Sequence, residues 1–239
     1  MGIRRGSIST PIIADGLIFN IDAANRASYP AQRTFAIAES GSCYNTLDLT
    51  QSGSFISDPQ FITQPISASC WGFDGVDDYI DCGNDSSLHN PNFTISLWVY
   101  QPSTASSVEI ISNGLGAWAA KDYGFNIGRY WSNYRFYIGD GTTSYDSSVT
   151  ATADTWQHLF MSYDGTDVKT YLNGVLDDTV AVPSINYSNS AQNSFIIGKS
   201  ANSGLELTGN IANIQLYNRA LSATEVLHNY NALKGRFGL

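Results

Sequence analysis

A short polar stretch of the chain contains five aromatic residues that could bind carbohydrate. The stretch from 113 to 134 is rich in Gly and Asn and contains Trp118, Tyr123, Tyr130, Trp131 and Tyr134. Exposed aromatic rings can stack on sugar rings, while neighbouring Asn and Asp side chains hydrogen bond to hydroxyl groups. Large aromatics also fill hydrophobic cores and subunit contacts. The stretch therefore fits either a sugar-binding platform or a packed surface.

Carboxylates at four positions could hold a calcium ion. Calcium takes about six to eight oxygen ligands, and carboxylates are usually among them. Asp22, Asp48, Asp77 and Asp78 are the candidates. Aspartate is also common in turns, where its side chain accepts local hydrogen bonds. We favour the turn interpretation and expect that no cofactor is required.

The remaining reactive residues form no recognisable catalytic group. His89, His158 and His228 are scattered along the chain. His158 lies beside Trp156 at a strand position, which favours a packed ring over a catalytic one. The chain has no Gly-x-Ser-x-Gly elbow, phosphate-binding loop or HExxH motif. These patterns favour a protein without catalytic activity.

Composition indicates one large all-β domain. The chain has 239 residues, of which 43% are hydrophobic, 13% aromatic and only 14% charged. Many short strands suit this composition better than a helical bundle does. The net charge of −9 argues against a nucleic-acid partner, because phosphate binding needs a basic surface. No stretch reaches the apolar length of a transmembrane helix.

The three cysteines do not form a disulfide framework. The chain has an odd number of cysteines, Cys43, Cys70 and Cys82. One disulfide, such as Cys70 to Cys82, is still possible. The sequence has no CxxC motif and no cluster of Cys and His residues, so a structural zinc site is not expected. The first residues include Arg4 and Arg5 without a following apolar run, so we expect no signal peptide. Both features suit a protein that folds in a reducing cytoplasm.

Alternation and turn signals predict the strands. In 93–100, Phe93, Ile95, Leu97 and Val99 fall on one face and the polar and aromatic residues on the other. Asp164-Gly165 and Asn173-Gly174 predict two consecutive hairpin turns. Further strands are expected at the segments 16–22, 109–112, 134–138, 194–198 and 211–217.

One helix is predicted at about 222–234. Ser222 and Glu225 have the spacing of a capping box, in which each side chain satisfies a free backbone N–H of the first turn. Apolar residues follow at helical spacing, and Gly235 is the expected C-terminal stop. We expect this helix to pack against the edge of the sandwich.

An ordered set of motifs resembles the laminin-G-like, concanavalin A-like domains. The resemblance covers about 16–227, and the motifs that carry it are Phe73-Asp74-Gly75-Val76-Asp77-Asp78-Tyr79, Trp98-Val99, Trp156-Gln157-His158, Tyr171-Leu172-Asn173-Gly174 and Tyr217-Asn218-Arg219-Ala220-Leu221-Ser222. It implies an all-β fold, a two-sheet antiparallel jelly-roll sandwich with one short C-terminal helix. We expect one such domain over 15–239, preceded by an arm over 1–14.

The resemblance also implies ligands. Domains of this kind often bind glycans, and some hold calcium at the sandwich rim through an acidic pair in the last strand. Ala212 and Asn213 stand at those positions here, which argues against that calcium site. The related glucanases carry a Glu-x-Asp-x-Glu strand, which this sequence lacks.

The two ends of the chain resemble those of such domains in virion proteins of tailed, especially marine, phages. They imply a non-enzymatic virion surface protein, in capsid decoration or in a tail fibre, that contacts host or environmental glycans. Its partners would be other virion proteins, docked through the N-terminal arm, and multiple copies on a particle would raise avidity. The alternatives are a free carbohydrate-binding adhesin module and a degenerate glycoside hydrolase.

Overall fold

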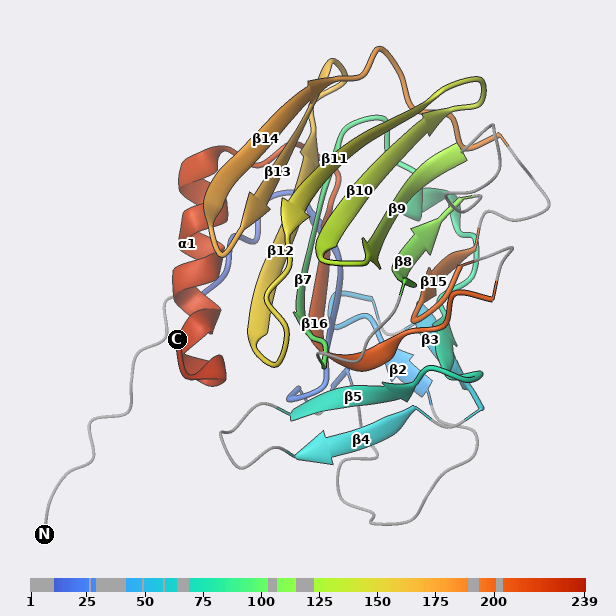
Figure 1. The fold of residues 1–239 in the computed structure, drawn as a ribbon, viewed down its shortest axis with the longest axis vertical. Coiled ribbons are helices and arrows are strands. Elements are labelled where there is room, and N and C mark those ends of the chain that lie inside the picture. Colours follow the sequence, from blue (N-terminus) through green and yellow to red (C-terminus); the bar gives the residue numbers. More distant parts are fainter. Residues whose placement is uncertain are drawn as a thin grey trace, which may run out of the picture.

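The fold is a sandwich of two antiparallel sheets (Figure 1). The computed structural model describes residues 11–25, 27–28, 42–48, 50–57, 59–63, 69–102, 107–114, 123–188, 194–200 and 204–239. Every strand pair recorded among these residues is antiparallel. The predicted fold class is therefore confirmed.

Two sheets of eight strands each form the layers, named here sheet A and sheet B. Sheet A contains, in spatial order, β14 (Val175–Ala181), β13 (Asp167–Leu172), β12 (Trp156–Tyr163), β7 (Phe93–Tyr100), β16 (Thr208–Tyr217), β5 (Ser69–Asp74) and β4 (Gln60–Thr63), and β1 (Leu17–Asp22) also pairs with β16. Sheet B contains β11 (Ser144–Thr150), β10 (Asn133–Asp140), β9 (Tyr123–Tyr130), β8 (Val108–Asn113), β15 (Phe195–Ile197), β6 (Tyr79–Asp81), β3 (Ser52–Ile56) and β2 (Ser42–Tyr44).

Strand β7 shows how the sequence pattern becomes two buried faces. Phe93, Ile95, Leu97 and Val99 are completely buried in the core between the sheets, as their alternation predicts. Trp98 on the opposite face is equally buried, in a separate cluster outside sheet A. The second face is buried because other elements cover it, which alternation alone does not reveal.

The two predicted hairpins are confirmed. Strands β12 and β13 pair through the Asp164-Gly165 turn, and β13 and β14 pair through Asn173-Gly174. Asn173 and Gly174 both adopt positive φ, 53° and 79°, as a tight hairpin turn requires. Strand β14 runs to Ala181, longer than the sequence indicated.

The helix α1 (Ala223–Leu233) begins at the predicted capping box, since Ser222 and Glu225 satisfy each other's backbone N–H groups. It lies across the outer face of sheet A, not at the edge of the sandwich (Figure 1). Gly235 does not end it, because the chain continues into the 3-10 helix η3 (Lys234–Phe237). The left-handed residue is Gly238, with φ 76°. A second 3-10 turn, η2 (Ser86–Leu88), follows β6. Among the described residues, no helix has the length and apolar character to cross a membrane.

Part of the predicted N-terminal arm packs on its own chain. The backbone N–H of Ile13 donates to Oδ1 of Asn229 in α1 at 2.8 Å, and the Tyr217 hydroxyl donates to the Ile13 carbonyl at 3.1 Å. Nε2 of His228 lies 2.8 Å from the carbonyl oxygen of Pro11. The chain is therefore fixed to α1 from Pro11 onward, and positions 1–10 lie outside the described residues.

The cysteines are free thiols. Cys70 lies on the outer face of sheet A, in the cluster with Trp98, and burial raises the pKa of its thiol to about 12. Cys82 follows β6 of sheet B and packs against the main core. The Cys70–Cys82 bridge that the sequence left open is therefore wrong, because the two residues lie on different sheets and different packing clusters.

His158 is a packed residue, as predicted. It is completely buried, and its ring stacks on Trp98 with centroids 4.4 Å apart. Neither ring nitrogen has a hydrogen-bond partner in the described part of the chain. Burial in this apolar site lowers the pKa of His158 well below its ordinary value of 6.5, because the imidazolium form loses its solvation.

This burial predicts a pH dependence of stability. Below about pH 6.5 the unfolded chain gains a proton on this ring that the folded chain does not bind, so stability falls as pH falls. The full slope for one proton is about 1.4 kcal/mol per pH unit. His158→Phe should remove this slope between about pH 6.5 and 5, which urea unfolding at several pH values measures. A variant with the wild-type slope would contradict the assignment.

Candidate functional site

One row of residues across the outer face of sheet A combines amides, an aromatic ring and bare backbone. The register pairs Gln60 of β4 with Gly72 of β5, Gly72 with Asn210 of β16, and Asn210 with Tyr100 of β7. Residues directly opposite one another in antiparallel strands point to the same face. The row therefore places two carboxamides and a phenol ring on one face, with a glycine between the two carboxamides.

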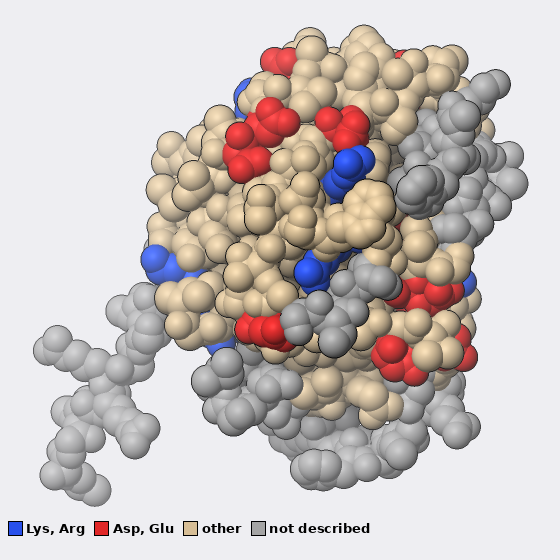
Figure 2. All heavy atoms as spheres, viewed as in Figure 1, with Lys and Arg blue, Asp and Glu red and all other residues tan. Residues whose placement is uncertain are grey.

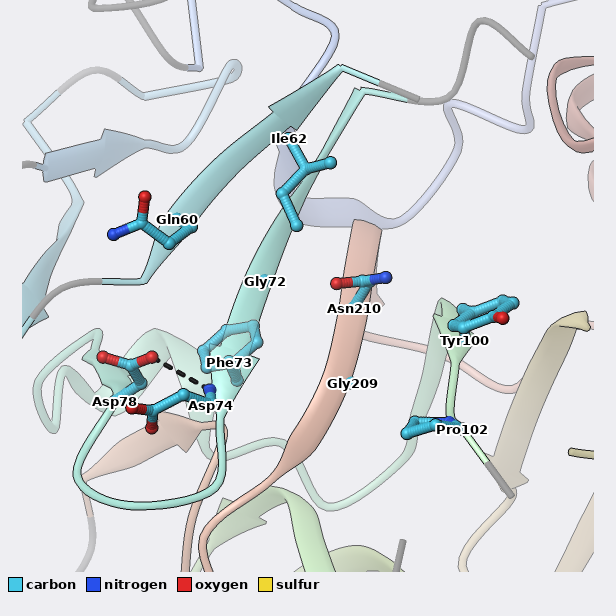
Figure 3. Close-up of a pocket in the computed structure, with 10 residues that line it drawn as sticks. All are labelled: Gln60, Ile62, Gly72, Phe73, Asp74, Asp78, Tyr100, Pro102, Gly209 and Asn210. Atoms are coloured by element: carbon cyan, nitrogen blue, oxygen red, sulfur yellow. Dashed lines mark hydrogen bonds between the residues drawn. The ribbon is translucent and has the colours of Figure 1, made fainter. Parts of the chain in front are cut away.

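A hollow of about 300 Å³ follows this row and is called the groove here (Figure 3). It is lined by Gln60, Ile62, Gly72, Phe73, Asp74, Asp78, Tyr100, Pro102, Gly209 and Asn210. Figure 3 shows the side chains of β4 on one side, Tyr100 and Pro102 on the other, and Asn210 between them. The volume is at the lower end of the range for small-ligand sites.

Two glycines at the floor of the groove allow close packing of their neighbours. A Cβ atom at Gly72 would lie 2.5 Å from Cδ1 of Ile62 and 3.1 Å from Oδ1 of Asn210. A Cβ atom at Gly209 would lie 2.5 Å from the carbonyl oxygen of Tyr100, and Gly209 has a φ of 150°. Glycine at both positions therefore lets Ile62, Asn210 and the backbone of Tyr100 pack closely at the floor of the groove.

Carboxylates close one end of the groove, in the turn between β5 and β6. Asp74, Asp77 and Asp78 offer oxygen atoms that all lie within 4.8 Å of one another. Oδ2 of Asp78 accepts from the backbone N–H of Asp74 at 3.0 Å (Figure 3), and Oδ1 of Asp74 accepts from Val76 N–H at 2.8 Å. Asp78 is 4% exposed, whereas Asp74 and Asp77 are exposed. The turn therefore fixes two of the three carboxylates and presents negative charge at the groove.

The other two predicted calcium ligands lie elsewhere. Asp22 binds Arg236 in a bidentate ion pair, with Nη1 to Oδ2 at 2.7 Å and Nη2 to Oδ1 at 3.0 Å. Asp48 accepts from the hydroxyl and the backbone N–H of Thr50, and these bonds lower its pKa. The structure thus brings together Asp77 and Asp78 with Asp74, which the sequence did not single out, and separates Asp22 and Asp48 from them.

The position of the family's calcium site carries no carboxylate. Ala212 is completely buried against Trp98 and Phe237. Asn213 is 1% exposed, and its Nδ2 donates to Oδ1 of Asn20 at 3.2 Å and to the carbonyl of Ile21 at 3.1 Å. These residues tie β16 to β1 and do not fit a calcium ion.

The structure separates the aromatic residues predicted to form a sugar platform. Tyr134 is completely buried in the main core, and burial raises its pKa. Tyr130 is 3% exposed, and its hydroxyl donates to Oε2 of Glu109 at 2.7 Å. Neither ring offers a free face to a ligand. Tyr123 begins β9 and is half-buried, and Trp118 lies outside the described residues.

Trp131 is exposed and lies in a turn linked to the groove. It sits between β9 and β10, is 73% exposed and has a φ of 55°. Nε of Arg129 donates to the carbonyl of Trp131 at 3.1 Å, and Nη1 donates to the carbonyl of Pro102 at 3.2 Å. Because Pro102 lines the groove, one guanidinium connects the groove wall to the turn that carries Trp131.

The groove residues Gln60, Tyr100 and Asn210 were missed by the sequence reasoning. For Tyr100 the sequence contained one signal. Tyr100 lies on the same face of its strand as Trp98, and two large aromatic side chains on one face indicate that other elements contact this face. No signal for Gln60 was available, because its place beside Asn210 depends on the pairing of β4, β5 and β16.

Solved structures share this fold at low sequence identity. The binding domain of botulinum neurotoxin DC in complex with rat synaptotagmin II aligns over 91% of this chain with a TM-score of 0.66 and 14% identity. The binding domain of Paraclostridial mosquitocidal protein 1 aligns over 90% with a TM-score of 0.67 and 14% identity. The chain covers 52% of each of these two structures, about half their length.

The sequence comparisons identify the superfamily. A search of curated proteins gives no significant match. The family model described as the concanavalin A-like lectin/glucanases superfamily matches residues 74–227, well over half of the sequence. This match, over strands arranged as two stacked antiparallel sheets, shows that the chain belongs to the concanavalin A-like lectin/glucanases superfamily.

Proposed function

We propose that this chain is a non-enzymatic carbohydrate-binding domain and that it binds glycan in the groove on the outer face of sheet A. The observation that carries the proposal is the row formed by Gln60, Gly72, Asn210 and Tyr100. It combines an aromatic ring with carboxamides, which can both donate and accept hydrogen bonds. A sugar presents the matching surfaces, an apolar ring face and a rim of hydroxyl groups.

The chemistry of the groove suits reversible binding. Tyr100 is half-buried, so part of its ring remains free to pack on a sugar. Asn210 is half-buried and Gln60 is exposed, and a carboxamide side chain has two N–H donors and one carbonyl acceptor. Because a shallow site of this size gives weak individual contacts, display of several copies would supply the avidity.

Binding functions among the structural neighbours support the same class. One neighbour is the binding domain of botulinum neurotoxin DC in complex with SialylT, with a TM-score of 0.67. Another is a structure of botulinum neurotoxin type C, whose cell entry depends on interaction with two ganglioside molecules. These neighbours are binding modules, which favours recognition over catalysis for this chain.

We expect glycan binding to need no cation. The family's calcium position holds Ala212 and Asn213, both buried, and neither supplies a carboxylate. The melting temperature and the glycan signal should therefore be the same in calcium and in EDTA.

A glycan array followed by calorimetry on the strongest hit tests the proposal. Tyr100→Ala and Asn210→Ala should each weaken binding by about tenfold or more, as expected for the loss of a stacking ring or of hydrogen bonds to an uncharged ligand. Asn92→Ala is the matched control, since Asn92 is exposed and precedes the opposite end of β7. The control should bind as the wild type does. Absence of any glycan signal from the wild-type protein contradicts the proposal.

We further propose that the domain acts on the surface of a phage virion, in capsid decoration or in a tail fibre. The resemblance of its two ends to phage virion proteins supports this setting. Residues 1–10 precede the segment that is fixed to α1, and we propose that they dock on another virion protein. Labelling of the protein in purified particles tests the setting, and particles without label would argue for a free adhesin instead.

A further inference from the structure

We propose that the groove selects sugars that are uncharged or carry an amino group, and that it rejects sugars bearing a carboxylate or sulfate, such as sialylated glycans. This inference rests on the proposed carbohydrate-binding function and specifies the ligand class. Two carboxylates, Asp74 and Asp78, line the groove, and none of the lining residues that the structure describes is a Lys or Arg. The exposed carboxylate of Asp77 lies within 4.8 Å of theirs.

Two of the described arginines, Arg129 and Arg236, are engaged with partners inside the protein. Arg129 is 6% exposed and donates to the carbonyl groups of Pro102 and Trp131. Arg236 forms its bidentate ion pair with Asp22. Both guanidinium groups bind partners inside the protein. They therefore do not offer a ligand carboxylate the pair of parallel N–H donors with which arginine usually binds it.

The ammonium of Lys199 lies 3.8 Å from the centre of the Tyr79 ring, in a cation–π contact. Acidic side chains also gather elsewhere on the surface, for example over β14 on the face shown in Figure 2. The net charge of −9 therefore adds long-range repulsion of anions to the local repulsion at the groove. The long-range part is screened by salt, whereas the local part is screened less.

The turn holds its charge close to the ligand position. Asp78 is 4% exposed and its Oδ2 accepts from the N–H of Asp74, which holds its carboxylate in the turn. Asp74 follows Gly72 by two residues on the same strand, so its side chain projects from the same face as the groove floor. A sugar carboxylate in the groove would therefore face two like charges. Like-charge contacts of this kind lower affinity by about tenfold or more.

A glycan array printed with neutral glycans, each beside its sialylated form, tests the inference in EDTA buffer. The wild-type protein should bind neutral glycans, and terminal sialic acid should lower the signal of a bound glycan by about tenfold or more. In Asp74→Lys the penalty should shrink to about twofold or less, because the groove then loses one negative charge and gains a positive one. Equal binding of both forms by the wild type, or an unchanged penalty in Asp74→Lys, would overturn the inference.

The matched control is Asp177→Lys, which makes the same change in net charge on the exposed face of β14, outside the groove. It should keep the wild-type penalty, which separates a local effect from the overall charge. If the protein binds no glycan in either form, both the selectivity and the proposed glycan-binding function are contradicted. A protein that binds only sialylated glycans sinks the selectivity and leaves the glycan-binding function standing.

Discussion

Replacing Trp98 by Ala is expected to lower the free energy of unfolding by about 3–5 kcal/mol. Trp98 is completely buried on the outer face of sheet A and lies at the centre of an aromatic stack. Its ring centroid is 4.0 Å from that of Phe237, 4.4 Å from that of His158 and 5.8 Å from that of Tyr230. Removal of the indole would leave a cavity that these rings, fixed on three different elements, cannot close.

Chemical denaturation gives the measurement, and the chain provides a matched control. Trp131 is 73% exposed, so Trp131→Ala should change the free energy of unfolding by less than about 0.5 kcal/mol. Equal effects of the two substitutions would show that α1 and η3 do not cover sheet A as the structure has it. A change in the denaturant dependence would indicate an altered unfolded or native state instead.

This substitution also bears on the groove. Ile62 and Tyr100, from its opposite walls, pack against the cluster that contains Trp98. Under conditions where Trp98→Ala stays folded, we expect weaker glycan binding, because the groove walls lose the surface against which they are held.

Replacing Asn45 by Ala is expected to lower the free energy of unfolding by about 2–4 kcal/mol. Asn45 directly follows β2, and its completely buried side chain contacts β1. Its Oδ1 accepts from the backbone N–H of Asn20 at 3.0 Å, and its Nδ2 donates to the carbonyl of Ile18 at 2.9 Å and to Oε1 of Gln51 at 2.8 Å. Alanine would leave these partly buried groups without their partner, and each group that is buried and unsatisfied costs up to about 1–3 kcal/mol.

The control for Asn45 is an exposed asparagine. Asn84→Ala should stay within about 0.5 kcal/mol of the wild type. Hydrogen exchange should show in addition that the N–H of Asn20 loses protection in Asn45→Ala. If Asn45→Ala is as stable as Asn84→Ala, Asn45 does not hold β1 against the segment after β2.

Strands with strict alternation and helices with a capping signal could be predicted from the sequence. The eight residues of β7 match the predicted range, and the Asn173-Gly174 turn and the Ser222–Glu225 box have the predicted geometry. These features depend on neighbours in the chain, so local preference decides them. The region before β5 was not predictable in this way, since its short strands β2, β3 and β4 are held by distant partners.

The candidate site shows more clearly what could not be predicted from the sequence. The aromatic stretch that drew attention in the sequence divides between the core, where Tyr134 is buried, and the surface, where Trp131 is exposed. Whether a ring faces a ligand or the core depends on which face of the strand is covered. That information is held by the other sheet and by α1, and not by the aromatic residues themselves.

The sequence by itself determined the fold class, the strand and turn positions of the second half, the helix start and the packed state of His158. It also determined the loss of the acidic pair at Ala212 and Asn213. Only the tertiary structure decided that Gln60, Gly72, Asn210 and Tyr100 form one row and that Asp74 and Asp78 close its end. The physical reason is register: periodicity fixes which way a side chain points within its own strand, but the pairing of β4, β5, β16 and β7 fixes which side chains stand beside one another.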